Sequence, residues 1–513
     1  MAAMAGCGTT LEEIPPELDA QHYECMQHYE ADGPVMVRKS GQPAPESSFL
    51  TINLSKGAFE WRLAMVDSAT ESLDLQYFLW RTDDTGALLI RRVVEAANRG
   101  VKVRMLMDDL DSVAWNERAA ILSLHPNIEV RVFNPFQKKR GGWTGRSTEF
   151  LTELDRLNHR MHNKLMLADN KAAIVGGRNI GNEYFGAGSP LDYRDYDLIA
   201  IGPIAKELKD SFETYWNSVW SDPVRDLPEG DVPAEEIDTL RAELDDQISE
   251  SALLDAEFER EPQDWSARIA AAQSQLITAR ARSVFDCPPP GGDQFPIQSA
   301  YTLRNMMKQT QNETLIVSPY FVPLEQFREF LGGVIDSGVN IRLLTNSLAA
   351  TDHTYAFSGY YNHRQELLSR GVEIYELRPD AAMWSLHRTE SSQAKFVALH
   401  AKVVVLDRRW VYVGSMNFDP RAAHWNTELG LLVESEALAN EVIGHFSEDL
   451  SPDSSWRVER RYVETGGADG NKTGRYRLYW ISDQGETTKE PSRGWSQRLG
   501  RWFYSLLPIE EQL

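Results

Sequence analysis

The chain has 513 residues, of which 42% are hydrophobic and 10% aromatic, and this composition indicates a globular protein with about two to four domains or two fused lobes. Its formal net charge of −23 argues against long-range attraction to DNA, RNA or an anionic membrane. An anionic substrate would therefore have to be captured locally, by a small basic site in an acidic body.

Residues 1–45 are expected to form an N-terminal tail. The segment Met4-Ala5-Gly6-Cys7 resembles the end of a bacterial lipoprotein signal, in which a small residue precedes a lipidated cysteine, but only six residues stand before Cys7. Two interpretations stay open: a chance run of small residues, or a start site placed too late, with Cys7 as a lipid anchor. The cysteines are too scattered to indicate a disulfide framework or a zinc site, and no run of about 18 apolar residues predicts a membrane-spanning helix.

Residues 46–222 are predicted to form a first α/β lobe. The apolar run Leu73–Trp80 is typical of a strand, a helical pattern follows it, and Gly100 then turns the chain into a second strand, Val101–Arg104. The helical pattern is carried by Leu88, Leu89, Val93 and Ala97. Alternation of strand, helix and strand implies βαβ units.

Residues 293–451 repeat this order. Thr314–Val322 opens a second unit, and Gly338 leads into a strand, Val339–Arg342, after a helix through Phe327, Phe330 and Leu331. Gly100 and Gly338 are 338 − 100 = 238 positions apart. The sequence therefore predicts an α/β fold with two lobes related by a pseudo-twofold axis, each with a mixed, mostly parallel sheet.

Two further segments complete the expected organisation. Residues 223–292 are acidic and are predicted to form a solvated helical connector that ends in a Pro- and Gly-rich loop. Residues 452–513 are expected to contain a strand at Arg475–Trp480 and an amphipathic helix with Trp495, Leu499, Trp502, Phe503 and Leu506 on one face. That helix fits either packing on the body or lying in a membrane interface.

One sparse pattern of three polar residues occurs in each lobe. The chain reads HNKLMLAD from His162 and HAKVVVLD from His400, and the two histidines are 400 − 162 = 238 positions apart. Alternate side chains of a strand share a face, so Lys164 is predicted to lie beside His162, and Lys402 beside His400.

The aspartates that close the two patterns, Asp169 and Asp407, count among the candidate catalytic residues because the pattern includes them. Each follows its histidine by seven positions, an odd number, so a regular strand turns it to the opposite face. The spacing thus favours a structural role for both.

Each pattern is followed by an asparagine at the same distance. Asn179 lies 179 − 162 = 17 positions after His162, and Asn417 lies 417 − 400 = 17 positions after His400. If the lobes pack about a twofold axis, two lysines and two asparagines surround the oxygens of one phosphate, with an imidazole on each side of the phosphorus. One imidazole can then attack while the other protonates the leaving alcohol, with no metal or other cofactor.

The paired HxKxxxxD motifs, with GGRN and GSMN behind them, resemble the phospholipase D superfamily. Longer stretches look like bacterial cardiolipin synthases of the C type, and the resemblance covers roughly residue 50 to the C-terminus, apart from the acidic connector. These stretches are Arg160–Lys164, Gly176–Asn182, Leu344–Ala350, Asn417–Arg421 and Ser505–Ile509.

The resemblance implies a phosphatidyltransferase that works in two steps. His162 would attack a phospholipid phosphodiester and become a phosphohistidine, and His400 would protonate the departing alcohol and deprotonate the incoming one. By position, Asp195 would orient His162, with Asp197 as an alternative, and Glu428 would orient His400. The other interpretation of these acids is a structural carboxylate.

Several alternatives remain at this stage. The expected substrates are phosphatidylglycerol and possibly phosphatidylethanolamine at a membrane surface, in a bacterial, peripherally associated protein; a phospholipase D that releases phosphatidic acid uses the same groups. A nuclease is disfavoured by the acidic charge, so no nucleic-acid partner is expected, and the complete motifs disfavour an inactive lipid-binding protein. The basic loop Gln137–Trp143 could meet lipid phosphates or be merely solvated.

Overall fold

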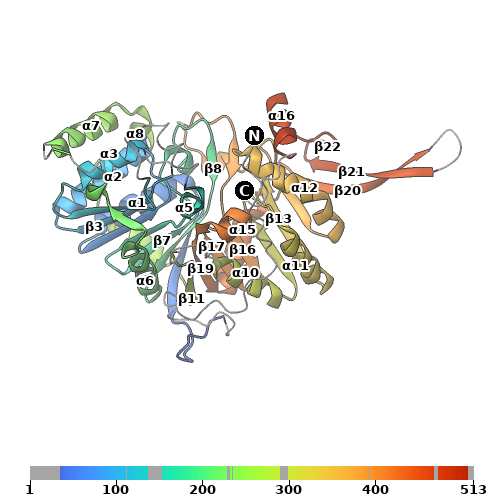
Figure 1. Cartoon of the computed structure of the whole chain (residues 1–513), viewed down its shortest axis with the longest axis horizontal. Coiled ribbons are helices and arrows are strands. Elements are labelled where there is room, and N and C mark those ends of the chain that lie inside the picture. Colours follow the sequence, from blue (N-terminus) through green and yellow to red (C-terminus); the bar gives the residue numbers. More distant parts are fainter. Residues whose placement is uncertain are drawn as a thin grey trace.

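A computed structural model describes residues 35–110, 113–136, 153–227, 232–233, 235–288, 298–390, 392–466 and 472–505. Figure 1 shows two α/β lobes side by side, with a hairpin projecting from the second. The expected tail up to residue 34, including Cys7, lies outside the described residues, as does the basic loop Gln137–Trp143.

The first lobe has a mixed sheet that begins with a βαβ unit. Strands β2, β3 and β4 are parallel, and β6, β7, β9 and β1 continue the sheet in antiparallel pairs. Antiparallel pairs outnumber parallel pairs among the described strands of both lobes, so the expectation of mostly parallel sheets is wrong. Short turns, such as the one between β6 and β7, join neighbouring strands antiparallel. The strands are β1 (Glu46–Ile52), β2 (Ser72–Tyr77), β3 (Lys102–Asp108), β4 (Ile128–Phe133), β6 (Leu165–Ala168), β7 (Ala172–Gly176), β9 (Asp197–Ile201) and the edge strand β10 (Ser221–Pro223). The helices are α1 (Ser55–Ser68), α2 (Asp84–Asn98), α3 (Val113–Leu122), α5 (Leu154–Asn158) and α6 (Ile204–Trp216).

The second lobe repeats this order, as the sequence predicted. Strands β12, β13 and β14 are parallel, and β16 pairs antiparallel with β12 just as β6 pairs with β2. The strands are β12 (Glu313–Val317), β13 (Asn340–Asn346), β14 (Glu373–Leu377), β16 (Val403–Leu406), β17 (Trp410–Gly414) and β19 (Leu429–Glu434). The helices are α10 (Gln298–Gln309), α11 (Glu325–Asp336), α12 (Thr354–Arg370), α13 (Trp384–His387), α14 (Pro420–His424) and α15 (Glu436–Ser447).

The corresponding glycines take the same backbone conformation in both lobes. Gly100 and Gly338 have φ values of +100° and +98°, in the left-handed region where a side chain is strained. Each ends a helix and turns the chain into the next parallel strand, as expected from the sequence.

One strand joins the two sheets into a single open sheet. Strand β11 (Ile277–Phe285) pairs with β1 of the first lobe and with β19 of the second. The prediction of a helical connector over residues 223–292 is therefore wrong for β11, whose small and polar residues (ITARARSVF) hid its strand character. The other elements of residues 223–292 include the helices α7 (Glu236–Glu250), α8 (Ala252–Glu257) and α9 (Ser266–Gln273). Helix α7 buries Leu240, Leu244 and Ile248 against the first lobe.

Cys287, just after β11, is disulfide-bonded, which the scattered cysteines did not indicate.

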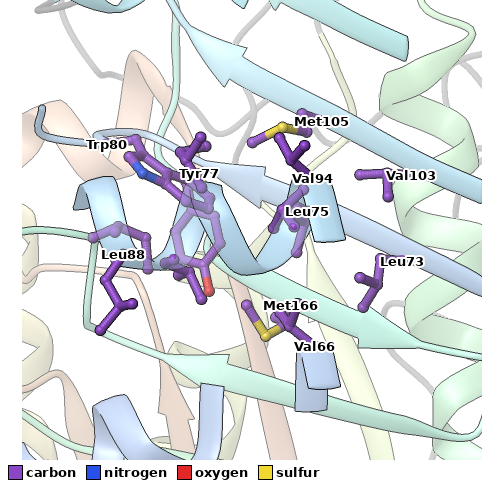
Figure 2. Packing of buried hydrophobic residues seen from close by; sticks show 14 of the residues in the cluster. Val66, Leu73, Leu75, Tyr77, Trp80, Leu88, Val94, Val103, Met105 and Met166 are labelled. Carbon is purple, nitrogen blue, oxygen red and sulfur yellow. The ribbon is translucent and has the colours of Figure 1, made fainter. Parts of the chain in front are cut away.

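The joined sheet folds over so that its two halves face each other. Strand β7 contacts β17 and β19 across the interface. The shared core between the halves includes Leu165, Val175 and Leu198 from the first lobe and Val403, Val413 and Leu431 from the second. Alternate residues of the same strands point outward under the helices; Figure 2 shows this in the first lobe, where Leu73, Leu75 and Tyr77 of β2 pack beneath α1 and α2.

The C-terminal segment adds a hairpin and a helix to the second lobe. The hairpin of β20 (Ser455–Gly466) and β21 (Lys472–Ser482) extends the sheet beyond β14 and contains the predicted strand at Arg475–Trp480. Strand β22 (Gly485–Thr487) and helix α16 (Trp495–Tyr504) follow. Within the described ranges, every helix is too short or too polar to cross a lipid bilayer.

The aspartates of the two motifs cap the start of a neighbouring strand. Asp169 accepts backbone N–H groups of Thr70, Glu71 and Ser72 at 2.7–3.2 Å, ahead of β2. Although burial opposes it, these donors lower the pKa of Asp169. Asp407 accepts N–H groups of three residues, Gln311 to Glu313, at 2.7–3.1 Å ahead of β12. Both aspartates thus bind backbone N–H groups ahead of a neighbouring strand, which fits the structural role that their odd spacing favoured.

We expect Asp169→Asn and Asp407→Asn to lower the free energy of unfolding by about 2 kcal/mol each, because hydrogen bonds to a charged acceptor are lost. Asparagine tolerates the left-handed φ of 51° and 49° at these positions, which keeps backbone strain out of the comparison. Urea unfolding measures the change, and turnover per folded molecule should stay near wild type. Lost turnover at unchanged stability would show that the aspartates act chemically.

Candidate active site

Two short strand pairs carry the histidines to the interface between the lobes. Strand β5 (Arg160–Met161) pairs in parallel with β18 (Asn426–Thr427), and β8 (Asp192–Arg194) pairs in parallel with β15 (Val397–Leu399). The backbone N–H of His162 then donates to Thr427 at 2.9 Å, and that of His400 donates to Arg194 at 2.8 Å. Each histidine therefore follows a strand that hydrogen-bonds to the other lobe.

The expectation that each motif lies within one strand is wrong for its first three residues. Residues 162–164 and 400–402 form irregular links between short strands, and regular β6 and β16 begin only afterwards. The lysine side chains nevertheless lie beside their histidines. Lys164 Nζ donates to the carbonyl oxygen of His162 at 2.5 Å, and Lys402 Nζ lies 3.0 Å from Nδ1 of His400.

Each histidine is paired with an acid from the other lobe. Nδ1 of His162 lies 2.9 Å and 3.0 Å from the two carboxylate oxygens of Glu428, and Nδ1 of His400 lies 2.6 Å from Oδ2 of Asp195. The predicted assignment was the reverse and is wrong. The parallel strand pairs explain the exchange, because Glu428 directly follows β18 beside β5, and Asp195 directly follows β8 beside β15.

The alternative acid Asp197 serves another purpose. Its Oδ2 accepts from Arg62 at 3.1 Å and from Arg178 at 3.0 Å, in a fully buried ion cluster beneath the site. Arg178 also donates to the carbonyl oxygen of Asp195 at 2.8 Å. Asp197 thus supports the segment that holds Asp195 and contacts neither imidazole.

The four charged or titratable side chains of the motifs share one buried site. His162 and His400 are each 7% exposed, and Lys164 and Lys402 are each 1% exposed. Burial lowers the pKa of His162 well below its ordinary value, and the charges of Lys164, Lys402 and His400 lower it further. The crossed contacts with Glu428 and Asp195 place both motifs at the interface between the lobes, where the sequence predicted that they meet.

The pKa values of both motif lysines lie near neutral pH. Burial lowers the pKa of Lys164 to about 7, opposed by Glu428 and reinforced by Lys402. Burial lowers the pKa of Lys402 to about 8 against the opposing charges of Asp195 and Glu428. Both amines are therefore protonated below about pH 7, and a bound phosphate would favour the protonated forms further.

The pKa values of the two acids are shifted in opposite directions. Burial raises the pKa of Glu428 well above its usual range, although Lys164 and the Ser415 hydroxyl, which donates to this carboxylate, oppose the rise. Burial also acts on Asp195, but the charge and hydrogen bond of His400, with Lys402 and Arg178, hold its pKa below the usual range. Burial lowers the pKa of His400 to about 4, with Lys402 adding to the effect and Asp195 opposing it. Both imidazoles are therefore neutral at neutral pH before a substrate binds, which suits nucleophilic attack.

The asparagines that follow the two motifs are both buried. Asn179 accepts from the backbone N–H of Leu79 at 3.3 Å and donates to the Tyr184 hydroxyl at 2.9 Å. Its counterpart Asn417 is 6% exposed, and its Oδ1 has no hydrogen-bond partner within the described part of the chain. Of the two, Asn417 keeps an uncommitted amide oxygen, so the role of both asparagines at a phosphate stays a prediction.

The surroundings of the two imidazoles differ, and the sequence patterns gave no sign of this. Phe78 packs edge-on against His162 at 5.0 Å between ring centroids, whereas Tyr193 packs against His400 at 4.8 Å. Asp352 accepts from the Tyr193 hydroxyl at 2.6 Å and from the Tyr320 hydroxyl at 2.9 Å. The wall beside His400 is therefore polar and hydroxyl-rich, and the wall beside His162 is apolar.

Comparison with known proteins agrees with this geometry. A family described as "Cardiolipin synthase, PLD-like domain" matches residues 63–216 and 303–450, the two lobes that supply the histidines. The chain belongs to this family of the phospholipase D superfamily. It is 34% identical over 466 residues to Cardiolipin synthase C of Escherichia coli (strain K12), which covers 89% of this chain and 94% of that protein.

More distant relatives share the fold. Cardiolipin synthase of Oceanobacillus iheyensis is 24% identical over 396 residues, covering 76% of this chain and 66% of that protein. The crystal structure of phosphatidylserine synthase from Haemophilus influenzae Rd KW20 aligns with a TM-score of 0.55 at 13% identity, over 80% of this chain and 87% of that chain. The predicted α/β architecture with two lobes of this superfamily is thereby confirmed.

The crossed acid pairing predicts separable effects on the two rings. Glu428→Gln should change the ring-nitrogen NMR signals of His162 and leave those of His400 nearly unchanged, because only the partner of His162 Nδ1 is altered. Asp195→Asn should do the opposite, and each variant should lower kcat at least about 100-fold. Spectra in which Glu428→Gln perturbs His400 alone would contradict the pairing.

The lysine pKa values predict an alkaline decline of activity. As pH rises through about 7 to 8, Lys164 and Lys402 lose the protons that offset the phosphate charge, so kcat/KM should fall across this range. Lys164→Arg keeps that charge in this range and leaves only Lys402 to titrate, so the decline of its residual activity should move toward about pH 8. A wild-type kcat/KM that still rises between pH 7 and pH 9 would contradict this role of the lysines.

Proposed function

We propose that this protein is a cardiolipin synthase-like phosphatidyltransferase that moves a phosphatidyl group between phospholipids through a phosphohistidine. The observation that carries the proposal is the pair of buried imidazoles, each bound at Nδ1 by an acid of the other lobe, with a buried lysine beside each. Holding Nδ1 in this way directs Nε2 of each ring toward the shared site.

The first step forms the covalent intermediate. Nε2 of His162 attacks the phosphorus of the donor phospholipid, a bond from phosphorus to nitrogen forms, and the bond from phosphorus to the headgroup oxygen breaks. His400, made imidazolium by the charge of the bound phosphodiester, gives its proton to that oxygen. Lys164 and Lys402 offset the charge on the non-bridging oxygens.

The second step discharges the intermediate. His400, now neutral, takes the proton of an incoming hydroxyl, whose oxygen attacks the phosphorus as the bond to His162 breaks. With phosphatidylglycerol as the acceptor, the hydroxyl belongs to its glycerol headgroup and the product is cardiolipin. The polar wall of Tyr193, Tyr320 and Asp352 on the His400 side suits a hydroxyl-bearing headgroup.

Water as the acceptor gives the alternative function, a phospholipase D that releases phosphatidic acid. The family and the relatives named cardiolipin synthase favour the transferase. Four expectations stay predictions: phosphatidylethanolamine as a substrate, the lack of a nucleic-acid partner, peripheral association with a bacterial membrane, and a lipid anchor at Cys7.

Purified protein incubated with phosphatidylglycerol, with and without phosphatidylethanolamine, should form cardiolipin detectable by lipid mass spectrometry. A larger yield with both lipids identifies phosphatidylethanolamine as a donor. Phosphatidic acid as the sole product in both mixtures would reject the transferase in favour of the hydrolase.

His162→Ala should lower turnover at least about 1000-fold while keeping the wild-type unfolding transition, because the nucleophile is lost from a site that stays packed. Denaturant quenching of the wild type during turnover, followed by peptide mass spectrometry, should find the phosphatidyl adduct on His162. An adduct on His400 instead would reverse the two roles.

A further inference from the structure

Helix α16 packs on the body with its polar side and turns its apolar side outward. Trp495, Leu499, Trp502 and Phe503 occur at helical spacing on one face, and their exposed fractions are 76%, 53%, 55% and 53%. A helix that covers a protein core buries such a stripe. Helix α16 instead exposes its apolar stripe.

Polar and small residues make the inward contacts of α16. The Arg501 guanidinium lies 4.0 Å from the centre of the Tyr361 ring on α12 and pairs with Glu490 at 3.3 Å. A side chain at Gly500 would meet Thr354 of α12, and Tyr504 contacts Tyr355. These contacts fix the helix, so its outward stripe is held in place.

The hairpin beside α16 is basic, in contrast to the rest of the chain. Residues 455–482 contain six Lys and Arg against three Asp and Glu, a net charge of 6 − 3 = +3 in a protein of net charge −23. Tyr462 and Tyr476 are 56% and 51% exposed and pack edge-on at 5.3 Å. In Figure 1 this hairpin of β20 and β21 projects from the body. Trp456, Trp480 and Arg498 line one cavity, which places the base of the hairpin next to α16.

Helix α16 is also linked by side-chain contacts to the polar wall beside His400. Arg493, just before α16, donates to the carbonyl oxygen of Thr351 at 3.0 Å, next to Asp352. The Tyr355 ring stands between α16 and His353, whose ring contacts Tyr320 at 5.7 Å. The apolar stripe is therefore tied to the polar wall beside His400.

We propose that α16 and the β20–β21 hairpin together form a membrane-docking surface, with the stripe of α16 inserted among the lipids and the hairpin bound to anionic headgroups. The proposal rests on the proposed function, because the substrates of that reaction are lipids within a bilayer. Aromatic and aliphatic residues of an amphipathic helix enter the interface, and arginines gain from anionic lipid. A local basic and apolar surface lets an acidic body approach an anionic bilayer on the side of the polar wall beside His400.

Co-sedimentation with vesicles of phosphatidylglycerol and phosphatidylcholine tests the surface. The double variant Trp495→Glu, Leu499→Glu should lower the partition coefficient of the protein onto the vesicles at least about tenfold, because two large apolar side chains can no longer be buried in the lipid. Val219→Glu is the matched control, because Val219 is 88% exposed just after α6 on the first lobe, and it should bind as wild type. Equal binding of the stripe variant and the control would overturn the proposal.

Arginines of the hairpin should contribute separately. Arg457→Gln combined with Arg475→Gln should weaken binding to the anionic vesicles about tenfold, flatten its salt dependence, and leave binding to pure phosphatidylcholine vesicles unchanged. Wild-type salt dependence in this variant would remove the hairpin from the docking surface and overturn the two-part proposal.

Two further measurements separate this proposal from its alternatives. In detergent micelles that contain phosphatidylglycerol, the stripe variant should keep wild-type turnover, because α16 takes no part in the chemistry. If the wild-type protein binds vesicles but makes no cardiolipin, the proposed function is rejected and the proposed docking surface is not. Sedimentation velocity tests a second copy as the occupant of the stripe. A wild-type dimer that the stripe variant converts to monomer, with vesicle binding unchanged, would overturn the proposal.

Discussion

The hydrogen bond between the imidazole of each motif and an acid of the opposite lobe is the interaction on which the site depends. It follows from two parallel pairings of very short strands, β5 with β18 and β8 with β15. These pairings bring His162 to Glu428 and His400 to Asp195 without any long-range rearrangement. Because parallel pairing fixes the register of the chains, it also fixes the position of each acid against its ring.

The surrounding structure holds these short strands in place with buried ion pairs. Arg194 of β8 forms two hydrogen bonds with Asp449, at 2.9 Å and 3.0 Å, and Asp108 accepts the backbone N–H of Met161 in β5 at 2.9 Å. The apolar core between the facing half-sheets, together with β11, sets the distance between the lobes. Breaking one of these buried ion pairs would leave an uncompensated charge, so the interface between the lobes is fixed by polar groups as well as by apolar burial.

Much of the fold and most of the site followed from repetition in the sequence. The shared offset of 238 between the histidines and between the turn glycines revealed the duplication, and the odd spacing of Asp169 and Asp407 gave their structural role. The sequence did not predict which histidine each acid contacts, because the order of residues along the chain does not show which strands pair across an interface. Asp195 and Asp197 are two residues apart, and only the break between β8 and β9 separates the acid at the ring from the one in the arginine cluster. Tyr193 and Asp352 belong to no repeated pattern and were missed for that reason.

The crossed arrangement bears on how such sequences are interpreted when only part of a chain is available. A fragment with the first lobe alone would retain an intact HxKxxxxD motif, yet its imidazole would lack the carboxylate that sets its tautomer, since Glu428 comes from the second lobe. Counting motifs therefore overstates the catalytic capacity of a truncated chain. Such a fragment would need another polypeptide to complete its proton-transfer machinery.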